Sequence, residues 1–313
     1  MAKYRNQLPQ LSGDLFVTDG GIETTLIFHE GLELPFFAAF DLLKHAAGES
    51  ALVKYFRTYA ALASRYDVGC ILESATWRAS ADWGAKLGYS KAALVEANRR
   101  AIAMLHRIRQ EFETSGTPMV ISGCIGPRGD GYNPASFMTE TEAENYHALQ
   151  AETFRAADAD MVTAITMTYP AEAIGIARAA QRVGMPVVIS FTVETDGQLP
   201  NGQSLKDAIE QVDGATNHLP AYYMINCAHP NHFAGVFDKD ASWTARIRGV
   251  RANASTKSHK ELDEATELDV GSPNELGRQY RQLRDKLASL NVLGGCCGTD
   301  HRPVEEICKA ILA

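Results

Sequence analysis

The chain has 313 residues, of which 45% are hydrophobic and 22% are charged, and its formal net charge is −8. These values are ordinary for a folded globular protein and exclude disordered, collagen-like and low-complexity chains. The excess of acidic groups argues against nucleic acid or an anionic membrane as a partner, because both attract basic faces.

The sequence also carries expectations about where the protein acts. The first residues, Met1 to Asp14, contain no apolar stretch behind a basic start, so we expect no secretory signal. No run of about 18 apolar residues occurs, so we expect no membrane span. Six cysteines are too few for a disulfide scaffold, and we expect a cytoplasmic protein whose cysteines are reduced.

Short runs of apolar and β-branched residues predict eight strands. In chain order these are Leu15–Thr18, Gly69–Glu73, Met119–Ser122, Met161–Thr166, Val187–Phe191, Tyr222–Asn226, Ile247–Val250 and Asn291–Leu293. Helical periodicity between the strands predicts helices, among them Ser50–Arg65, Lys91–Thr114, Glu142–Ala157, Ala171–Val183, Pro273–Leu290 and Pro303–Leu312. Polar segments that contain Gly or Asn predict loops at Gly126–Pro134, Glu194–Gln203 and Arg251–Glu267.

Eight strands, each followed by a helix or a long loop, predict a (β/α)8 barrel formed by a single domain, residues 1–313. A doubly wound open sheet is the alternative. That fold predicts fewer strands and a glycine-rich loop after the first one. The first strand ends in Thr18-Asp19-Gly20-Gly21, which lacks the required glycine spacing, so the barrel is favoured.

In such a barrel, the residues that follow the strands build the functional site. The polar and cysteine residues at these positions are Asp19, Ser74, Thr76, Arg78, Cys124, Thr166, Thr168, Asn226, Cys227, His229, Asn253, Cys296 and Cys297. Because the strand ends meet on one rim, side chains that are distant in sequence can converge there.

Three of the six cysteines lie after strands six and eight. Cys227 follows the sixth strand, and the adjacent Cys296 and Cys297 lie between glycines after the eighth. Three thiolates on one rim suit a zinc ion with one open position. The alternative is that they are small buried hydrophobes, as free cysteines often are; Cys70 and Cys308 are assigned to the core on that ground.

Two further interpretations concern the same loops. Cys124 has no ligand-like context and is expected to be structural, near the rim. A glycine-rich loop after the eighth strand also binds phosphate in some barrels, and His301 and Arg302 are the nearest basic residues. That alternative leaves the cysteines unexplained.

These residues resemble the homocysteine S-methyltransferase family, zinc-dependent barrels that use S-methylmethionine, S-adenosylmethionine, betaine or a methylated cofactor. The resemblance covers nearly the whole chain and rests on Thr18 to Gly21, Ser122 to Pro127, Ser190-Phe191 with Gly202 to Leu205, Asn226-Cys227 and Gly294 to Thr299. It implies that Cys227, Cys296 and Cys297 bind Zn²⁺. It further implies that Asp19 lies beside the amino acid's ammonium group and Ser74 beside its carboxylate; Thr76, Arg78 and Asn253 complete the expected substrate site.

Two positions differ from the family pattern. Ile165 stands where members usually carry a Glu that pairs with the substrate ammonium, and Arg78 stands where the betaine-using branch carries a Tyr. A buried ammonium without a partner costs several kcal/mol. Therefore Asp19 suffices, or Glu73 or Glu23 substitutes, or the substrate is not ordinary homocysteine. Arg78 either binds a carboxylate bidentately or is a solvated residue at a helix start.

The expected function is zinc-dependent transfer of a methyl group from a small sulfonium donor to the thiol of homocysteine, which forms methionine. Alternatives are a methyltransferase of the same fold that uses another thiol or betaine, a binding module without turnover, and a vicinal-dithiol redox or metal sensor. A Schiff-base lyase is disfavoured because no predicted strand contains lysine. His229 and Asn253 are candidates for supporting the zinc ligands. The oligomeric state is not indicated.

Overall fold

The computed structural model describes residues 1–132, 136–237, 242–265 and 267–313. Eight parallel strands form a closed barrel in sequence order, and β1 pairs with β8 to complete it. The strands are β1 (Phe16–Val17), β2 (Gly69–Glu73), β3 (Met119–Ile125), β4 (Met161–Met167), β5 (Val187–Thr192), β6 (Tyr222–Asn226), β7 (Ile247–Ala252) and β8 (Val292–Gly295). The predicted (β/α)8 barrel is confirmed, and each predicted strand bound differs from the observed one by no more than three residues.

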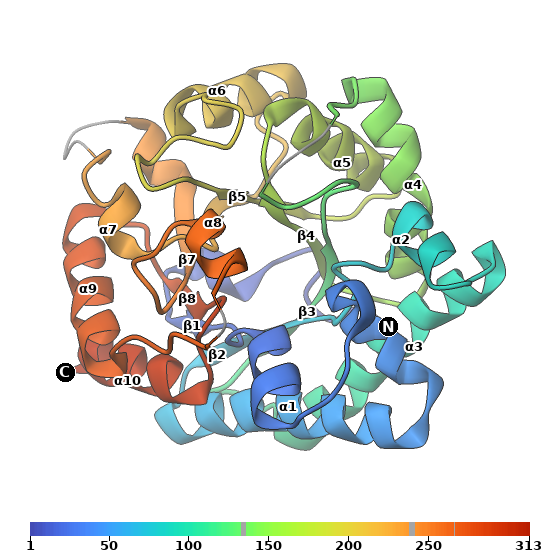
Figure 1. The fold of residues 1–313 in the computed structure, drawn as a ribbon, viewed down its shortest axis with the longest axis horizontal. Helices are drawn as coiled ribbons and strands as arrows, with labels where there is room; N and C mark the ends of the chain where they lie inside the picture. The colour runs from blue at the N-terminus through green and yellow to red at the C-terminus, as the bar shows by residue number, and fades with distance from the viewer. Residues whose placement is uncertain (133–135, 238–241, 266) are drawn as a thin grey trace.

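Helices surround the strands on all sides (Figure 1). The long ones are α1 (Ala46–Tyr66), α3 (Lys91–Phe112), α4 (Glu140–Ala156), α5 (Pro170–Arg182), α6 (Leu205–Thr216), α9 (Pro273–Lys286) and α10 (His301–Leu312). Shorter helices lie in the connections: α2 (Ala81–Lys86), α7 (Pro230–Phe233) and α8 (His259–Asp263), together with η1 (Pro9–Ser12), η2 (Thr24–His29), η3 (Pro35–Phe37), η4 (Ala39–Lys44) and η5 (Ser242–Arg246).

The apolar core has two main parts. Side chains between the strands and the surrounding helices form the larger one. A smaller cluster fills the barrel with residues from the first half of the strands, namely Phe16, Ile71, Val120, Met161, Val188, Tyr222, Met224 and Val292. The other half of the barrel interior is polar, and it leads to the rim where the strands end.

The predicted loops are only partly loops. Arg251–Glu267 was expected to be irregular, but it includes the end of β7 and the helix α8. Ser258 and Glu261 form a capping box at the start of α8, a pattern visible in the sequence. Glu194–Gln203 contains no helix or strand, although Gln198 pairs with Ser204 in an isolated bridge. Part of the predicted loop Gly126–Pro134 lies outside the described residues.

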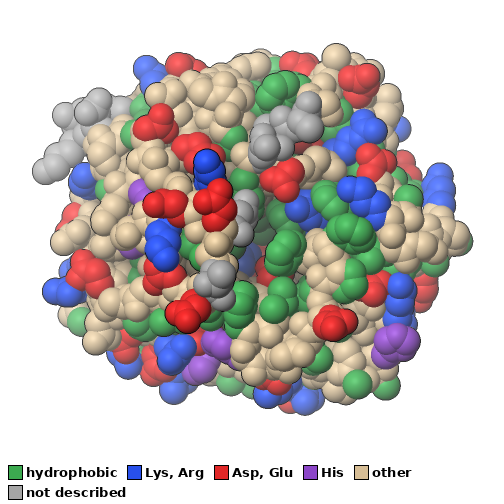
Figure 2. Space-filling view, in the orientation of Figure 1, with side chains coloured by type: hydrophobic (Ala, Val, Ile, Leu, Met, Phe, Trp, Pro, Cys, Tyr) green, Lys and Arg blue, Asp and Glu red, His purple; other side chains and the backbone are tan. Residues whose placement is uncertain are grey.

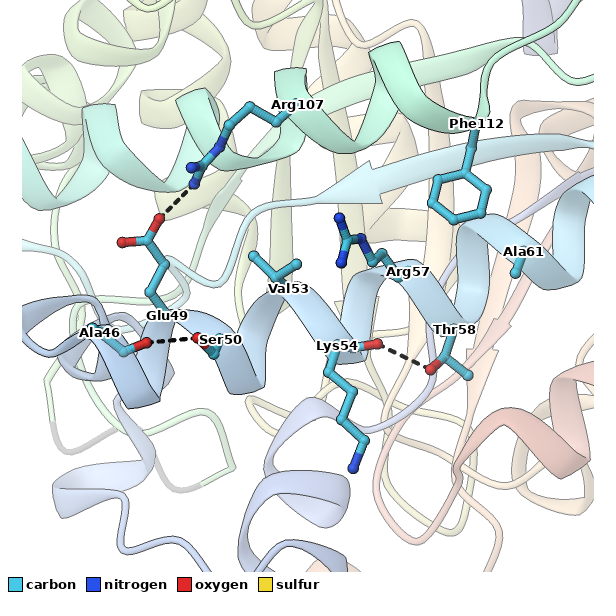
Figure 3. A pocket seen from close by; sticks show the side chains of 10 residues that line it. All are labelled: Ala46, Glu49, Ser50, Val53, Lys54, Arg57, Thr58, Ala61, Arg107 and Phe112. Atoms are coloured by element: carbon cyan, nitrogen blue, oxygen red, sulfur yellow. Dashed lines mark hydrogen bonds and ion pairs between the residues drawn. The ribbon is translucent and has the colours of Figure 1, made fainter.

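The outer surface carries a hollow of about 710 Å³ between α1 and α3 (Figure 3). Its charged side chains are paired with one another or with neighbours: Glu49 with Arg100 and Arg107, Lys54 with Glu30, and Arg57 with Glu111. This hollow therefore offers no free charge to a ligand. Within the described part of the chain, no helix has both the length and the apolar character needed to cross a membrane.

Candidate active site

The cysteines predicted as ligands come together on the rim. The sulfur atoms of Cys227, Cys296 and Cys297 all lie within 4.8 Å of one another. The sulfurs of Cys227 and Cys296 lie close enough to pair as a disulfide, with the Cα atoms 5.4 Å apart. Cys70 and Cys308 belong to the core, as expected.

The glycines beside the cysteines allow close approach of chain segments. A Cβ atom on Gly294 would collide with Thr18, and one on Gly295 would collide with Thr299. Left-handed backbone occurs instead at Gly298, with φ 77°, and at Cys227, with φ 54°. The glycine pair therefore seats the cysteine loop against the loop that follows β1.

Two side chains form hydrogen bonds with the backbone of the cysteine segments. Asn253 follows β7; its side-chain nitrogen donates to the Cys227 carbonyl and its oxygen accepts from the Cys297 backbone N–H. His259 of α8 donates from Nε2 to the same Cys227 carbonyl at 2.5 Å. Asn253 is thus placed to support the cysteines, and the sequence did not indicate His259. His229 instead accepts from the Asn231 N–H and caps α7.

Tyr132 is a rim residue that the sequence did not single out. It lies in the loop after β3, its hydroxyl is 3.7 Å from the Cys297 sulfur, and its ring lies 4.2 Å from that of His259. A tyrosine in an irregular loop has no periodic signal, which is why sequence reasoning missed it. Its position places a hydroxyl beside the Cys297 sulfur and an aromatic ring beside His259.

The carboxylate of Asp19 is bound by two side chains of the protein itself. Arg251, from the end of β7, lies 2.5 Å from one carboxylate oxygen, and the Tyr55 hydroxyl donates to the other at 2.8 Å. Arg251 also donates to the carbonyls of Gly295 and Gly20. The chain therefore neutralises internally the carboxylate that was expected beside the substrate ammonium.

Ser74 and Thr76 bind the neighbouring strand. The Ser74 hydroxyl accepts from the Cys124 N–H and lies 2.7 Å from the Thr76 hydroxyl, which donates to the Cys124 carbonyl. Cys124 is buried, and its structural assignment agrees with these contacts. The two hydroxyls thus connect the loop after β2 to β3.

Arg78 occupies an aromatic setting near these loops. Its guanidinium carbon lies 3.9 Å from the ring centres of both Trp77 and Trp83, and one nitrogen donates to the Gly129 carbonyl at 2.9 Å. The Trp77 indole donates to the carbonyl of Ile165 at the end of β4. Arg78 is only 5% exposed, so it is not a solvated residue at a helix start, which was the alternative that the sequence left open.

Two more carboxyl groups lie near the site. Burial raises the pKa of Glu73 to about 7, and the Arg251 guanidinium partly opposes that effect. Both Glu73 oxygens are buried without a well-aligned hydrogen bond, and the neighbouring hydroxyls of Thr163 and Ser122 also lower its pKa. Burial also raises the pKa of Glu23 to about 7; Glu23 precedes Thr24, whose hydroxyl accepts from the Gly298 N–H of the cysteine loop.

The residues on the rim fit a zinc ion. Three sulfur ligands from two loops match the soft donor set and the three-ligand count of a zinc site with an open position, once the Cys227–Cys296 pair is reduced. Asn253 and His259 fix the backbone behind these ligands, as supporting groups do in metal sites. The structure does not favour the alternative of a phosphate site, because the Arg302 guanidinium donates to the Asp300 carboxylate.

Figure 2 shows this face of the molecule with a hollow near its centre, bordered by hydrophobic side chains with acidic and basic groups around them. The hollow lies over the strands of the barrel in the view of Figure 1. The arrangement is suited to a small ligand with both apolar and charged parts.

Comparisons with known proteins identify the family of the chain and similar folds. The model of the family described as homocysteine S-methyltransferase matches residues 16–311. Similar solved structures include the homocysteine methyltransferase MmuM from Escherichia coli in a metallated form and in an oxidized form, both at 16% identity and a TM-score of 0.75. The match covers 96% of each chain for the first and 98% and 99% for the second. A search of curated proteins finds no match. At this identity the structural likeness shows the fold.

Proposed function

The chain belongs to the homocysteine S-methyltransferase family, and from that membership we propose that it transfers a methyl group from a small sulfonium donor to the thiol of homocysteine. The product is methionine. The observation that carries this proposal is the convergence of three cysteine sulfurs on one rim of the barrel. S-methylmethionine is the first donor to consider and S-adenosylmethionine the second.

The reaction needs a deprotonated acceptor. A thiol with a pKa near 8.5 is only about 3% thiolate at neutral pH, so complete deprotonation contributes about 2 kcal/mol. Zinc held by Cys227, Cys296 and Cys297 would favour the thiolate form of the acceptor. The acceptor sulfur forms a bond to the methyl carbon, the carbon–sulfur bond of the donor breaks, the donor leaves as a neutral thioether, and the thiol proton passes to solvent.

The protein's own groups supply placement. Asn253 and His259 fix the Cys227 and Cys297 segments, and Tyr132 bounds the space beside the sulfurs. Holding two reactants in line contributes more to the rate than deprotonation does, since oriented reactions gain up to about 7 to 11 kcal/mol. The polar interior of the barrel and the apolar border of the hollow determine which substrates fit.

The test is direct. We expect the reduced protein to bind about one zinc ion per chain and to form methionine from homocysteine with at least one sulfonium donor. Cys227→Ser should lose both the metal and the activity. Full activity in a folded protein that is free of metal would contradict the proposal.

A second candidate is the same reaction on another thiol. The observation that favours it is the ion pair between Asp19 and Arg251, which neutralises the carboxylate expected beside the homocysteine ammonium. Absence of turnover with homocysteine and each donor, together with methylation of a different thiol, would select this candidate.

A further inference from the structure

Arg78 is a buried cation that the chain itself leaves incompletely bound. It is 5% exposed, its Nε atom has no hydrogen-bond partner, and its one hydrogen bond is to the Gly129 carbonyl. None of the ion pairs in the described part of the chain involves it, although the carboxyl groups of Asp130 and Glu23 are near enough to raise its pKa. Burying a guanidinium without an ion-pair partner is costly, so an anionic ligand that pairs with Arg78 would offset that cost.

The surroundings of Arg78 fix it in place. Trp77 and Trp83 contact the guanidinium with their ring faces, which stabilises the charge and restricts the side chain. A guanidinium held in one plane presents parallel N–H groups that match the two oxygens of a carboxylate. The geometry therefore favours a planar, bidentate anion.

The alternative carboxylate-binding groups on this loop are engaged. The hydroxyls of Ser74 and Thr76 bind each other and the backbone of Cys124. The Ser74 N–H donates to the Ser122 carbonyl, and the Thr76 N–H donates to the Ser74 carbonyl. Among the described side chains after β2, Arg78 is thus the charged one that retains unmet hydrogen-bonding capacity, and the Trp83 indole nitrogen beside it is also without a partner.

Arg78 also lies within electrostatic reach of the cysteine site. Burial lowers the pKa of Arg78 to about 10, while Asp130, Tyr132 and Glu23 raise it. Tyr132 is the residue whose hydroxyl approaches the Cys297 sulfur. Glu23 belongs to the segment bound to the cysteine loop through Thr24. A ligand whose sulfur lies at the cysteines can therefore extend past Tyr132 toward Arg78.

We propose that Arg78 binds the α-carboxylate of an amino-acid substrate at the barrel rim, between the indole rings of Trp77 and Trp83. The inference rests on the proposed function in naming an amino acid as the substrate. Both the acceptor homocysteine and the donor S-methylmethionine carry such a carboxylate, and the experiment separates them.

The first experiment uses the zinc-loaded wild-type protein and no methyl transfer. Calorimetric titration compares homocysteine with its decarboxylated analogue, 3-aminopropanethiol, and S-methylmethionine with its decarboxylated analogue, (3-aminopropyl)dimethylsulfonium. Two of the three tryptophans of the chain flank Arg78, so tryptophan fluorescence gives an independent signal. We expect the carboxylate-bearing member of at least one pair to bind about 10- to 100-fold more tightly, since charged hydrogen bonds contribute about 1.5 to 3 kcal/mol, and to change the emission.

The second experiment uses two variants and a matched control. Arg78→Gln should weaken the carboxylate-bearing ligand by a similar factor and leave its carboxylate-free analogue unchanged. Arg78→Lys keeps the charge but not the bidentate geometry and should recover only part of the affinity. Arg128→Gln is the control, because Arg128 lies in the neighbouring loop but is 48% exposed and pairs with Asp82; it should bind every ligand like the wild type.

The outcomes separate this inference from the proposed function. Equal affinity of both members in each wild-type pair, or unchanged binding of homocysteine and S-methylmethionine to folded Arg78→Gln, overturns the inference even if methyl transfer proceeds. Carboxylate-dependent binding that is lost in Arg78→Gln supports it even if no methyl transfer is detected. The pair that responds identifies the acceptor or the donor as the source of the carboxylate.

Discussion

Individual residues in this barrel depart from the usual apolar filling. The interior of a (β/α)8 barrel is commonly packed with Val, Ile and Leu, but Glu73, Asp19 and Arg251 are buried in this one. Arg251 and Asp19 form an ion pair, whereas Glu73 has no ion pair and no well-aligned hydrogen bond in the described structure. Such a group lowers stability unless a ligand compensates for it, which is typical of a site selected for function.

Glu73 predicts a pH-dependent effect on stability. Burial raises its pKa from 4.5 to about 7, so the folded protein binds the Glu73 proton more tightly than the unfolded chain does. The resulting gain in the free energy of unfolding is fully present below pH 4.5 and is lost as the pH rises through about 7. That pKa difference corresponds to about 3 kcal/mol. Glu73→Gln should therefore match the wild type at pH 4.5 and exceed its free energy of unfolding by up to about 3 kcal/mol above pH 7.

Urea unfolding of both proteins across this pH range measures the difference. Glu96→Gln is the control, because Glu96 is 55% exposed and exposed substitutions change stability by about 0.5 kcal/mol or less. A Glu73→Gln variant that is less stable than the wild type at pH 8 would mean that the ionised carboxylate is stabilised by the fold.

At the scale of elements, the sequence was sufficient where one physical pattern dominates. The β-branched apolar runs located the strands because both faces of a barrel strand are buried. The glycine-flanked cysteines and the cysteine after the sixth strand located the three sulfurs that converge on the rim. Tyr132 and His259 were missed, since they reach the site through tertiary contacts of irregular segments. Arg251 was assigned to a loop because its charge ends an apolar run, although it lies within β7.

The connection after β7 predicts a contribution of Asn253 to metal affinity. Its amide joins the Cys227 carbonyl to the Cys297 N–H, so it fixes the ligand segments from β6 and β8 relative to each other. Removing such a supporting group typically weakens metal binding by about 10- to 100-fold. Asn253→Ala should show a loss of that size in competition with a chromophoric zinc chelator.

The matched control for Asn253 is Asn201→Ala, because Asn201 is exposed in the loop after β5 and accepts only from the Gln203 N–H. It should retain the wild-type zinc affinity. If Asn253→Ala also retains it, the two ligand segments are held by the barrel alone.

At the scale of the whole molecule, the proposed metal would connect the loop after β6 to the loop after β8. The strands close through hydrogen bonds between β8 and β1, while Cys227 and the Cys296-Cys297 pair extend from β6 and β8. A metal that binds these residues only in the folded chain must stabilise the fold by mass action. The metal would then raise the free energy of unfolding in addition to its role in the site.

Zinc should therefore raise the melting temperature of the reduced protein. At a free zinc concentration about 1,000 times the dissociation constant, the gain is about 4 kcal/mol. The unfolding entropy of a chain of this length converts that gain to a rise in Tm of about 6 °C. The measurement is calorimetry with and without zinc after reduction by a phosphine, which leaves no competing thiol. Cys297→Ser should lose most of the rise, whereas Cys308→Ala removes a core cysteine and should lower Tm while preserving the response to zinc. An equal response in both variants would place the bound zinc away from the three rim cysteines.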